Sequence, residues 1–200
     1  TLPSHLAGFN TLYGQMPSTV TADAGYGSEQ NYQFLAEKYI QAFVKDNYFD
    51  KDQHGTDKKH PFVVDKLHYN EQDDCYYCPM GQQMNRVGTR KHTNSDGFIQ
   101  IHTYYQAQNC QGCPLRGMCH KAHGNRVIEV NHQLRLLKAK ARALLLSEEG
   151  IKHRKKRPCD VEPVFGNIKY NKGFKRFMLS GCDKVEIEAG LLSIAHNLKK

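Results

Sequence analysis

The first fifty residues switch between strand-like and helix-like patterns of apolar and polar positions. Residues 18–23 (STVTAD) and 41–46 (QAFVKD) are typical of short strands. Residues 28–39 (SEQNYQFLAEKY) repeat apolar positions with helical spacing, and Ser28 is placed to cap that helix. The apolar face of this helix is expected to consist of Tyr32, Leu35, Ala36 and Tyr39. A strand, a turn, a helix and a strand with short connections predict an α/β unit with a parallel sheet.

The middle of the chain has a different pattern. Residues 51–128 are rich in Asp, His, Asn, Gln and Gly, and their apolar runs are short and isolated, as in 61–65 (PFVVD) and 97–105 (GFIQIHTYY). Such runs are expected to bury little apolar surface unaided. We therefore expect this segment to need another source of stability.

The remainder is helical in pattern. Residues 131–150 contain strong helix formers between a capping Asn131 and Gly150, and residues 184–200 read as a last amphipathic helix. Between them lies the basic run 151–158 (IKHRKKRP). The changes in pattern predict three segments, namely the first part of an α/β domain, an inserted module and a helical second part of the domain. Their expected ranges are 1–50, 51–128 and 129–200.

The net charge of the chain indicates the kind of partner that it binds. The chain has a formal net charge of +8, which favours a polyanionic partner, most simply nucleic acid. No run approaches the ~20 apolar residues that cross a bilayer, and residues 1–20 lack the pattern of a signal peptide. We expect a cytoplasmic, nucleoid-associated protein with no membrane contact.

Five of the seven cysteines predict a structural zinc site. Cys75 and Cys78 form one C-x-x-C pair, Cys110 and Cys113 form a second, and Cys119 follows closely. Each pair can place two thiolates on one tight turn at zinc-ligand distance, and the metal then replaces a missing core. Two ligand sets remain open: both pairs, or Cys78 with the three later cysteines. His120 and His123 are outside candidates.

Two acidic residues stand out as candidates for catalysis. Asp23 follows the first predicted strand on a glycine-bearing turn, and Asp46 at the end of the second strand is a weaker alternative. Glu162 is expected near a helix start capped by Asp160, with Lys169 on the same face two turns later. Two carboxylates that meet in a basic surface suit Mg²⁺-dependent phosphodiester chemistry.

Residues 21–31 (TADAGYGSEQN) and 160–200 (DVEPVFGNIK…LLSIAHNLKK) resemble the second half of a bacterial insertion-sequence transposase with a DDE catalytic domain. The cysteine-rich segment resembles an insertion found in one branch of that family. The resemblance implies a ribonuclease-H-like fold interrupted by a zinc-binding insertion. It also implies two Mg²⁺ (or Mn²⁺) ions held by an Asp, a second Asp and a Glu.

Carried over by residue, the resemblance assigns the second Asp to Asp23 and the Glu to Glu162. No residue matches the first Asp, so we expect the chain to be a fragment. Some relatives space a Tyr, an Arg and the Glu in a fixed signature, from which Arg157 is displaced by one residue, with Arg154 in place of the Tyr. The expected DNA-binding residues are Arg154, Lys155, Lys156, Arg157, Lys169, Lys172, Lys175 and Arg176.

The implied function is cleavage of one DNA strand at a transposon end and attack of the freed 3′ hydroxyl on target DNA. The expected partners are double-stranded DNA and a second copy of the protein in a homodimer. The alternative is a non-catalytic zinc-containing DNA-binding module or an inactive transposase remnant.

Three further groups carry open alternatives. The four cations of the 131–147 helix track a DNA backbone or solvate the helix. Four tyrosines stack on bases or pack a small core, and His196 is expected to pack in the core. The cations and tyrosines are Arg135, Lys138, Lys140, Arg142, Tyr76, Tyr77, Tyr104 and Tyr105.

Overall fold

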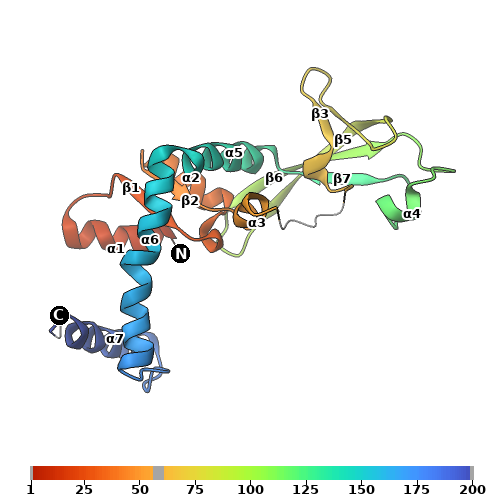
Figure 1. Ribbon diagram of the computed structural model, residues 1–200. Coiled ribbons are helices and arrows are strands. Elements are labelled where there is room, and N and C mark those ends of the chain that lie inside the picture. Colours follow the sequence, from red (N-terminus) through yellow and green to blue (C-terminus); the bar gives the residue numbers. More distant parts are fainter. Residues whose placement is uncertain (1, 56–60, 199–200) are drawn as a thin grey trace. The chain divides into compact units, whose positions relative to one another are not determined.

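The computed structural model describes residues 2–55 and 61–198 (Figure 1). The chain divides into two compact units, Thr1–Ser147 and Glu148–Lys200, which are described in turn. Among the described residues, no helix is both long enough and apolar enough to cross a membrane.

The first unit begins with the predicted α/β arrangement. Strands β1 (Thr19–Ala22) and β2 (Gln41–Val44) pair in parallel, with helix α2 (Glu29–Glu37) in the connection between them (Figure 1). The Ser28 side chain accepts a hydrogen bond from the Asn31 backbone N–H at 3.3 Å, which confirms the predicted cap. Helix α1 (Leu2–Tyr13) precedes β1, and the short helix α3 (Phe49–Gln53) follows β2.

The predicted apolar face of α2 is only partly correct. Tyr32 and Leu35 are buried, but Ala36 and Tyr39 are exposed. The helix ends at Glu37, and Tyr39 has a φ of 55°, a left-handed conformation that turns the chain towards β2. Ile40 then takes the buried position next to the strand.

The second part of the first unit is a five-stranded antiparallel sheet in the order β3-β4-β5-β6-β7 (Figure 1). A register shift between Arg86 and Gly88 interrupts the long β5–β6 pairing. The strands and the short helices beside them are β3 (His68–Asn70), β4 (Cys75–Tyr77), β5 (Gln83–Thr93), β6 (Ile99–Ala107), β7 (Val127–Val130), η2 (Val64–Lys66) and α4 (Arg116–Cys119).

This sheet corrects the expectation of a segment without a core of its own. One of its faces carries a buried cluster built around Tyr76 and Tyr105, which are both fully enclosed. The other buried members are Leu67, Met84, Ala107, Cys110, Ile128 and Val130. The run 61–65 is not a strand, since the chain turns there into the short helix η2.

Helix α5 (His132–Leu146) connects the two parts of the first unit. Asn131 caps it through a hydrogen bond from the Leu134 N–H at 2.8 Å, as predicted. Ala141 and Leu145 are buried, Ala141 in the cluster around α1, α2 and β2 and Leu145 against Phe43 and Phe49. The helix ends before Ser147 rather than at Gly150, because Ser147 is extended and Glu148 starts a new helix.

The second unit contains helix α6 (Glu148–Gly166), a π-helical segment η3 (Asn167–Asn171) and helix α7 (Cys182–Asn197). The expectation that Glu162 lies near a helix start is wrong, because α6 continues through both Pro158 and Pro163. Proline fixes φ at a helical value, so a helix can pass through it at the loss of a hydrogen bond. Lys169 lies in η3, beyond the end of the α-helix that carries Glu162.

Candidate functional site

Asp23 lies directly after β1, at the carboxyl end of the strand. Its side chain is exposed, and its backbone is extended with φ −73° and ψ 168°. The single-turn helix η1 (Ala24–Tyr26) follows, and the Tyr26 N–H donates to the Asp23 carbonyl at 3.0 Å. The Asn31 side chain donates to the Tyr26 carbonyl at 2.9 Å. The turn that presents Asp23 is therefore tied to the first turn of α2.

Gly27 fixes the same turn against β2. A Cβ atom at this position would lie 2.5 Å from the Lys45 carbonyl oxygen and 3.1 Å from the Tyr32 hydroxyl. No side chain fits there without a shift of backbone. The Tyr32 hydroxyl donates to the Val44 carbonyl at 3.2 Å, and burial together with nearby Asp46 raises the pKa of Tyr32 to about 12. It therefore remains a neutral donor near neutral pH.

Asp46 follows β2 at the corresponding strand end, but it is a buried ion-pair partner. Arg142 donates to both carboxylate oxygens, from Nε at 2.6 Å and from Nη2 at 2.9 Å, and the Tyr48 N–H donates at 3.0 Å. Burial by itself would raise the pKa of Asp46, but these hydrogen bonds outweigh it and lower the pKa. Arg142 also pairs with Asp52 at 2.7 Å, so its charge is used inside the fold.

Arg135 is the second cation of α5 with an internal partner. Its guanidinium donates to the Tyr76 hydroxyl and lies 5.8 Å from the centre of that ring. Of the two interpretations of these helix cations, tracking DNA or solvating the helix, neither fits Arg135 or Arg142. Both stabilise the packing of α5 on the rest of the unit.

Glu162 is exposed on α6, in the second unit. The predicted basic residues of this unit fall into two groups. Arg154, Lys155, Lys156 and Arg157 follow one another on α6, where Lys156 has a long contact of 3.9 Å with Asp160. The contact is exposed and contributes little.

Three of the other four basic residues line a pocket within the second unit. Its volume is about 330 Å³, and Lys169, Lys175 and Arg176 line it together with Phe165 and Phe174. The Lys172 ammonium is enclosed, and it has no hydrogen-bond partner among residues 2–55 and 61–198. Cations beside aromatic rings can contact both the phosphates and the bases of a nucleic acid.

Four cysteines meet around one small cavity in the first unit. Cys78, Cys110, Cys113 and Cys119 line a space of about 20 Å³, together with His120. Arg126 donates from its backbone to Cys110 Sγ at 3.4 Å and from Nη1 to Cys119 Sγ at 2.9 Å. Burial, followed by the charges of Arg116 and Arg126, lowers the pKa of His120, which keeps its imidazole neutral.

This donor set fits Zn²⁺, because sulfur and neutral imidazole are its usual ligands and the cavity holds one small sphere. Cys75 does not line the cavity: its side chain is buried on β4 with 1 % exposure.

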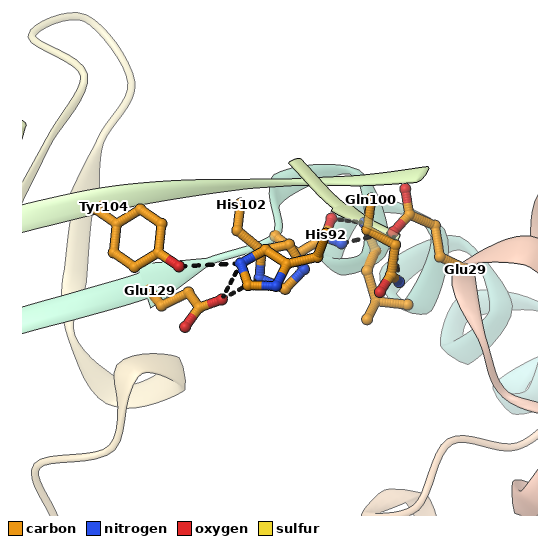
Figure 2. Close-up of polar contacts among 8 residues, drawn as sticks. Glu29, His92, Gln100, His102, Tyr104 and Glu129 are labelled. Carbon is orange, nitrogen blue, oxygen red and sulfur yellow. Dashed lines mark hydrogen bonds and ion pairs between the residues drawn. The ribbon is translucent and has the colours of Figure 1, made fainter. Parts of the chain in front are cut away.

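A group that the sequence analysis did not identify lies on the sheet face opposite the core of Tyr76 and Tyr105. Figure 2 shows its members. His92 on β5, His102 on β6 and Glu129 on β7 place ligand atoms within 4.8 Å of one another. His102 Nδ1 lies 2.5 Å and His92 Nε2 3.6 Å from Glu129 Oε1, and the Tyr104 hydroxyl is 3.1 Å from His92 Nε2. Their sequence spacing matches no motif, and only the strand register, with Tyr104 opposite Glu129, brings them together.

A second unpredicted group lies in the sheet core. The Tyr105 hydroxyl donates to Asp74 at 2.6 Å and lies 2.8 Å from His132 Nε2, while Tyr69 donates to Asp74 at 2.9 Å. Burial raises the pKa of Tyr105 and lowers that of His132. Tyr76 and Tyr105 are therefore core residues and not base-stacking platforms.

The class defined by these features is a basic α/β protein with an exposed acidic residue at the end of a parallel strand. A family model described as "Transposase DDE domain" matches residues 77–200, which is more than half of the chain. The chain belongs to this family of DDE transposases, whose substrate is DNA and which typically use a divalent metal ion. The matched range includes Glu162 and the four cavity cysteines, whereas Asp23 and Cys75 precede it. No curated protein and no solved structure matches the chain.

Proposed function

We propose that Asp23 and Glu162 are the metal-binding carboxylates of a transposase that cleaves one DNA strand and transfers it to target DNA. The observation that carries this proposal is the difference between two neighbouring strand ends. Asp46 is buried and neutralised by Arg142, whereas Asp23 is exposed on a turn fixed by Gly27. In a ribonuclease-H-like fold, the parallel β1–β2 pair would form part of the central sheet.

Asp23 and Glu162 are oxygen ligands of the kind that Mg²⁺ or Mn²⁺ prefers, and one or two carboxylates per ion are usual. Two such ions, when bound, supply activation of the attacking oxygen and stabilisation of the leaving oxygen. The basic residues of α6 and those around the Phe165 pocket would hold the DNA backbone. A homodimer would bring two transposon ends together.

The test is strand nicking of a duplex that carries the transposon end, in Mg²⁺, with Asp23→Asn and Glu162→Gln in the transposase. Each substitution removes one charge with little change of shape, so nicking should fall to background while DNA affinity stays within a few-fold. Glu37→Gln and Glu186→Gln are matched controls on exposed helix positions and should nick normally. Nicking by either site variant at the wild-type rate would exclude that residue from the site.

DNA binding has a separate test. Replacing Lys175 or Arg176 by alanine should weaken binding similarly for all sequences. The slope of log affinity against log salt concentration should fall by about one for each phosphate that the variant no longer neutralises. A full-length transposase that binds duplex DNA without metal-dependent nicking would support the alternative, a zinc-containing DNA-binding module.

We further propose that Cys78, Cys110, Cys113 and Cys119 hold a structural Zn²⁺ in an inserted module at residues 51–128. The support is their shared cavity and the absence of Cys75 from its lining. Metal content per chain should fall on Cys113→Ser and remain unchanged in Cys159→Ser, an exposed control. A folded wild-type protein without zinc would contradict the site.

A further inference from the structure

We propose that His92, His102 and Glu129 form a second metal site, distinct from the cysteine cavity and from Asp23 and Glu162, and that it takes Zn²⁺. The three residues come from three neighbouring strands and point to one place on the sheet face opposite the Tyr105 core (Figure 2). Two imidazoles and one carboxylate are a ligand set that Zn²⁺ accepts, with a fourth position left for water.

The distances are close to those that a metal needs. Ligand atoms ~2.0–2.1 Å from a tetrahedral Zn²⁺ lie about 3.4 Å from one another. His92 Nε2 and Glu129 Oε1 are 3.6 Å apart. His102 Nδ1 is 2.5 Å from the same oxygen, so this contact has to open by about 1 Å when the ion replaces the shared proton. Rotation of the partly exposed Glu129 side chain can provide that change.

His102 would bind the ion through Nδ1, the nitrogen that faces Glu129. Its other ring nitrogen, Nε2, is enclosed and has no hydrogen-bond partner among the described residues. The Tyr104 hydroxyl lies 3.1 Å from His92 Nε2, the nitrogen that would bind the ion, so this contact also has to open when the ion binds.

Exposure agrees with a site that exchanges metal with solvent. The side chains of His92 and Glu129 are 49 % and 44 % exposed, and that of His102 is 21 % exposed. Arg90 lies over the Tyr104 ring at 5.3 Å, and its positive charge opposes a bound cation. We therefore expect weaker binding here than at the thiolate cavity.

The position suggests what the ion does. β5 has one buried residue, Met84, and the rest of its length depends on pairing with β6. An ion bound to β5, β6 and β7 joins three strands at the point where the sheet approaches α2, since Gln100 opposite His92 donates to Glu29 at 3.0 Å. The proposed ion would stabilise the end of the β5–β6 hairpin by binding it to β7.

The test is a Zn²⁺ titration of the whole chain by calorimetry, with bound metal counted after gel filtration. His102→Asn and Glu129→Gln should each bind one equivalent less than the wild type, while His68→Gln, a histidine on β3 outside the cluster, should bind as the wild type does. The difference of one equivalent is independent of the cysteine site, because the cysteines are unchanged. Equal stoichiometry in the wild type and both site variants would overturn the proposal.

A measurement on the wild-type chain tests the site even if the variants fail to fold. Long-range ¹H–¹⁵N spectra report the state of every imidazole, and Zn²⁺ should shift the ring nitrogens of His92 and His102 together. A titration in which neither ring responds, while zinc binds elsewhere, would also overturn the proposal.

Discussion

Replacing Arg142 by methionine is expected to destabilise the first unit by about 3 kcal/mol. Methionine keeps much of the aliphatic length, but it removes both hydrogen bonds from the guanidinium to Asp46 and the ion pair with Asp52. The Asp46 side chain is 2 % exposed, so its charge is left buried with the Tyr48 N–H as its remaining donor in these contacts. Breaking a buried pair costs ~3–5 kcal/mol. Arg142 is 35 % exposed, and solvent screening places the value at the lower end.

The assay is urea unfolding followed by far-UV circular dichroism, with hydrogen exchange of β2 peptides to locate the loss in the first unit. Arg142→Lys keeps the charge without the two-pronged geometry and should lie between the wild type and Arg142→Met. The double variant Asp46→Asn, Arg142→Met leaves no buried charge, so it should be at least about 1 kcal/mol more stable than the sum of the single effects predicts.

Acid should remove the same stabilisation. The folded pKa of Asp46 is below its ordinary 3.8, so the contribution is present above that pH and is lost as the pH falls through the folded value. The difference between wild type and Arg142→Met should therefore shrink in strong acid. A loss below 1 kcal/mol at neutral pH, with additive single effects, would refute the role of the pair.

Gly27→Ala should destabilise the chain by about 1–3 kcal/mol and reduce nicking, because the added Cβ pushes the Asp23 turn away from Lys45. Gly25→Ala is its control, since nothing lies within 4 Å of that position, and thermal melts with a nicking assay compare the two. Tyr105→Phe should cost about 1–3 kcal/mol in urea unfolding by removing the donor to Asp74, whereas Tyr13→Phe at an exposed position should have little effect. The pKa of half-buried His132 is below its ordinary 6.5, so stability should be full above that pH and decline as the pH falls through the folded value. Melting temperatures between pH 8 and pH 5 should show a smaller decline in His132→Gln, and equal declines would contradict this.

The parts of the fold that could be predicted are those fixed by local signals. The apolar strand at β1, the Ser28 cap and the Asn131 cap each act within a few residues, and the structure confirms them. β5 could not be predicted in the same way, because Met84 is its one buried residue and the strand therefore has no alternation of apolar and polar positions. The prediction of a helix start near Glu162 is wrong because Pro163 and Gly166 indicate a boundary where α6 in fact continues.

The candidate site divides in the same manner. Asp23 could be identified from a strand followed by a glycine turn, whereas the burial of Asp46 in an ion pair with Arg142 could not be predicted. A carboxylate at a strand end can be an exposed candidate ligand or a buried ion-pair partner. Which of the two it is depends on the element packed against it. The cysteine spacing predicts a zinc site but leaves two ligand sets open, because the spacing does not show whether Cys75 on β4 lines the cavity. The histidine cluster has no local signal, since its members are joined only through the register of β5, β6 and β7.

Glu29 connects the α/β part of the first unit with the antiparallel sheet and with α5. It is buried at the first position of α2, where a helix N-terminus favours negative charge, and it accepts hydrogen bonds from Gln100 at 3.0 Å and Asn131 at 2.6 Å (Figure 2). The same Asn131 side chain caps α5 through its oxygen. The Asn131 amide therefore connects the starts of α2 and α5. Gln100 connects β6 to the same carboxylate. Because Ser28 and Asn31 beside Glu29 also hold the turn that carries Asp23, consecutive hydrogen bonds connect the β5–β6 hairpin, the start of α2 and the turn of the proposed catalytic carboxylate.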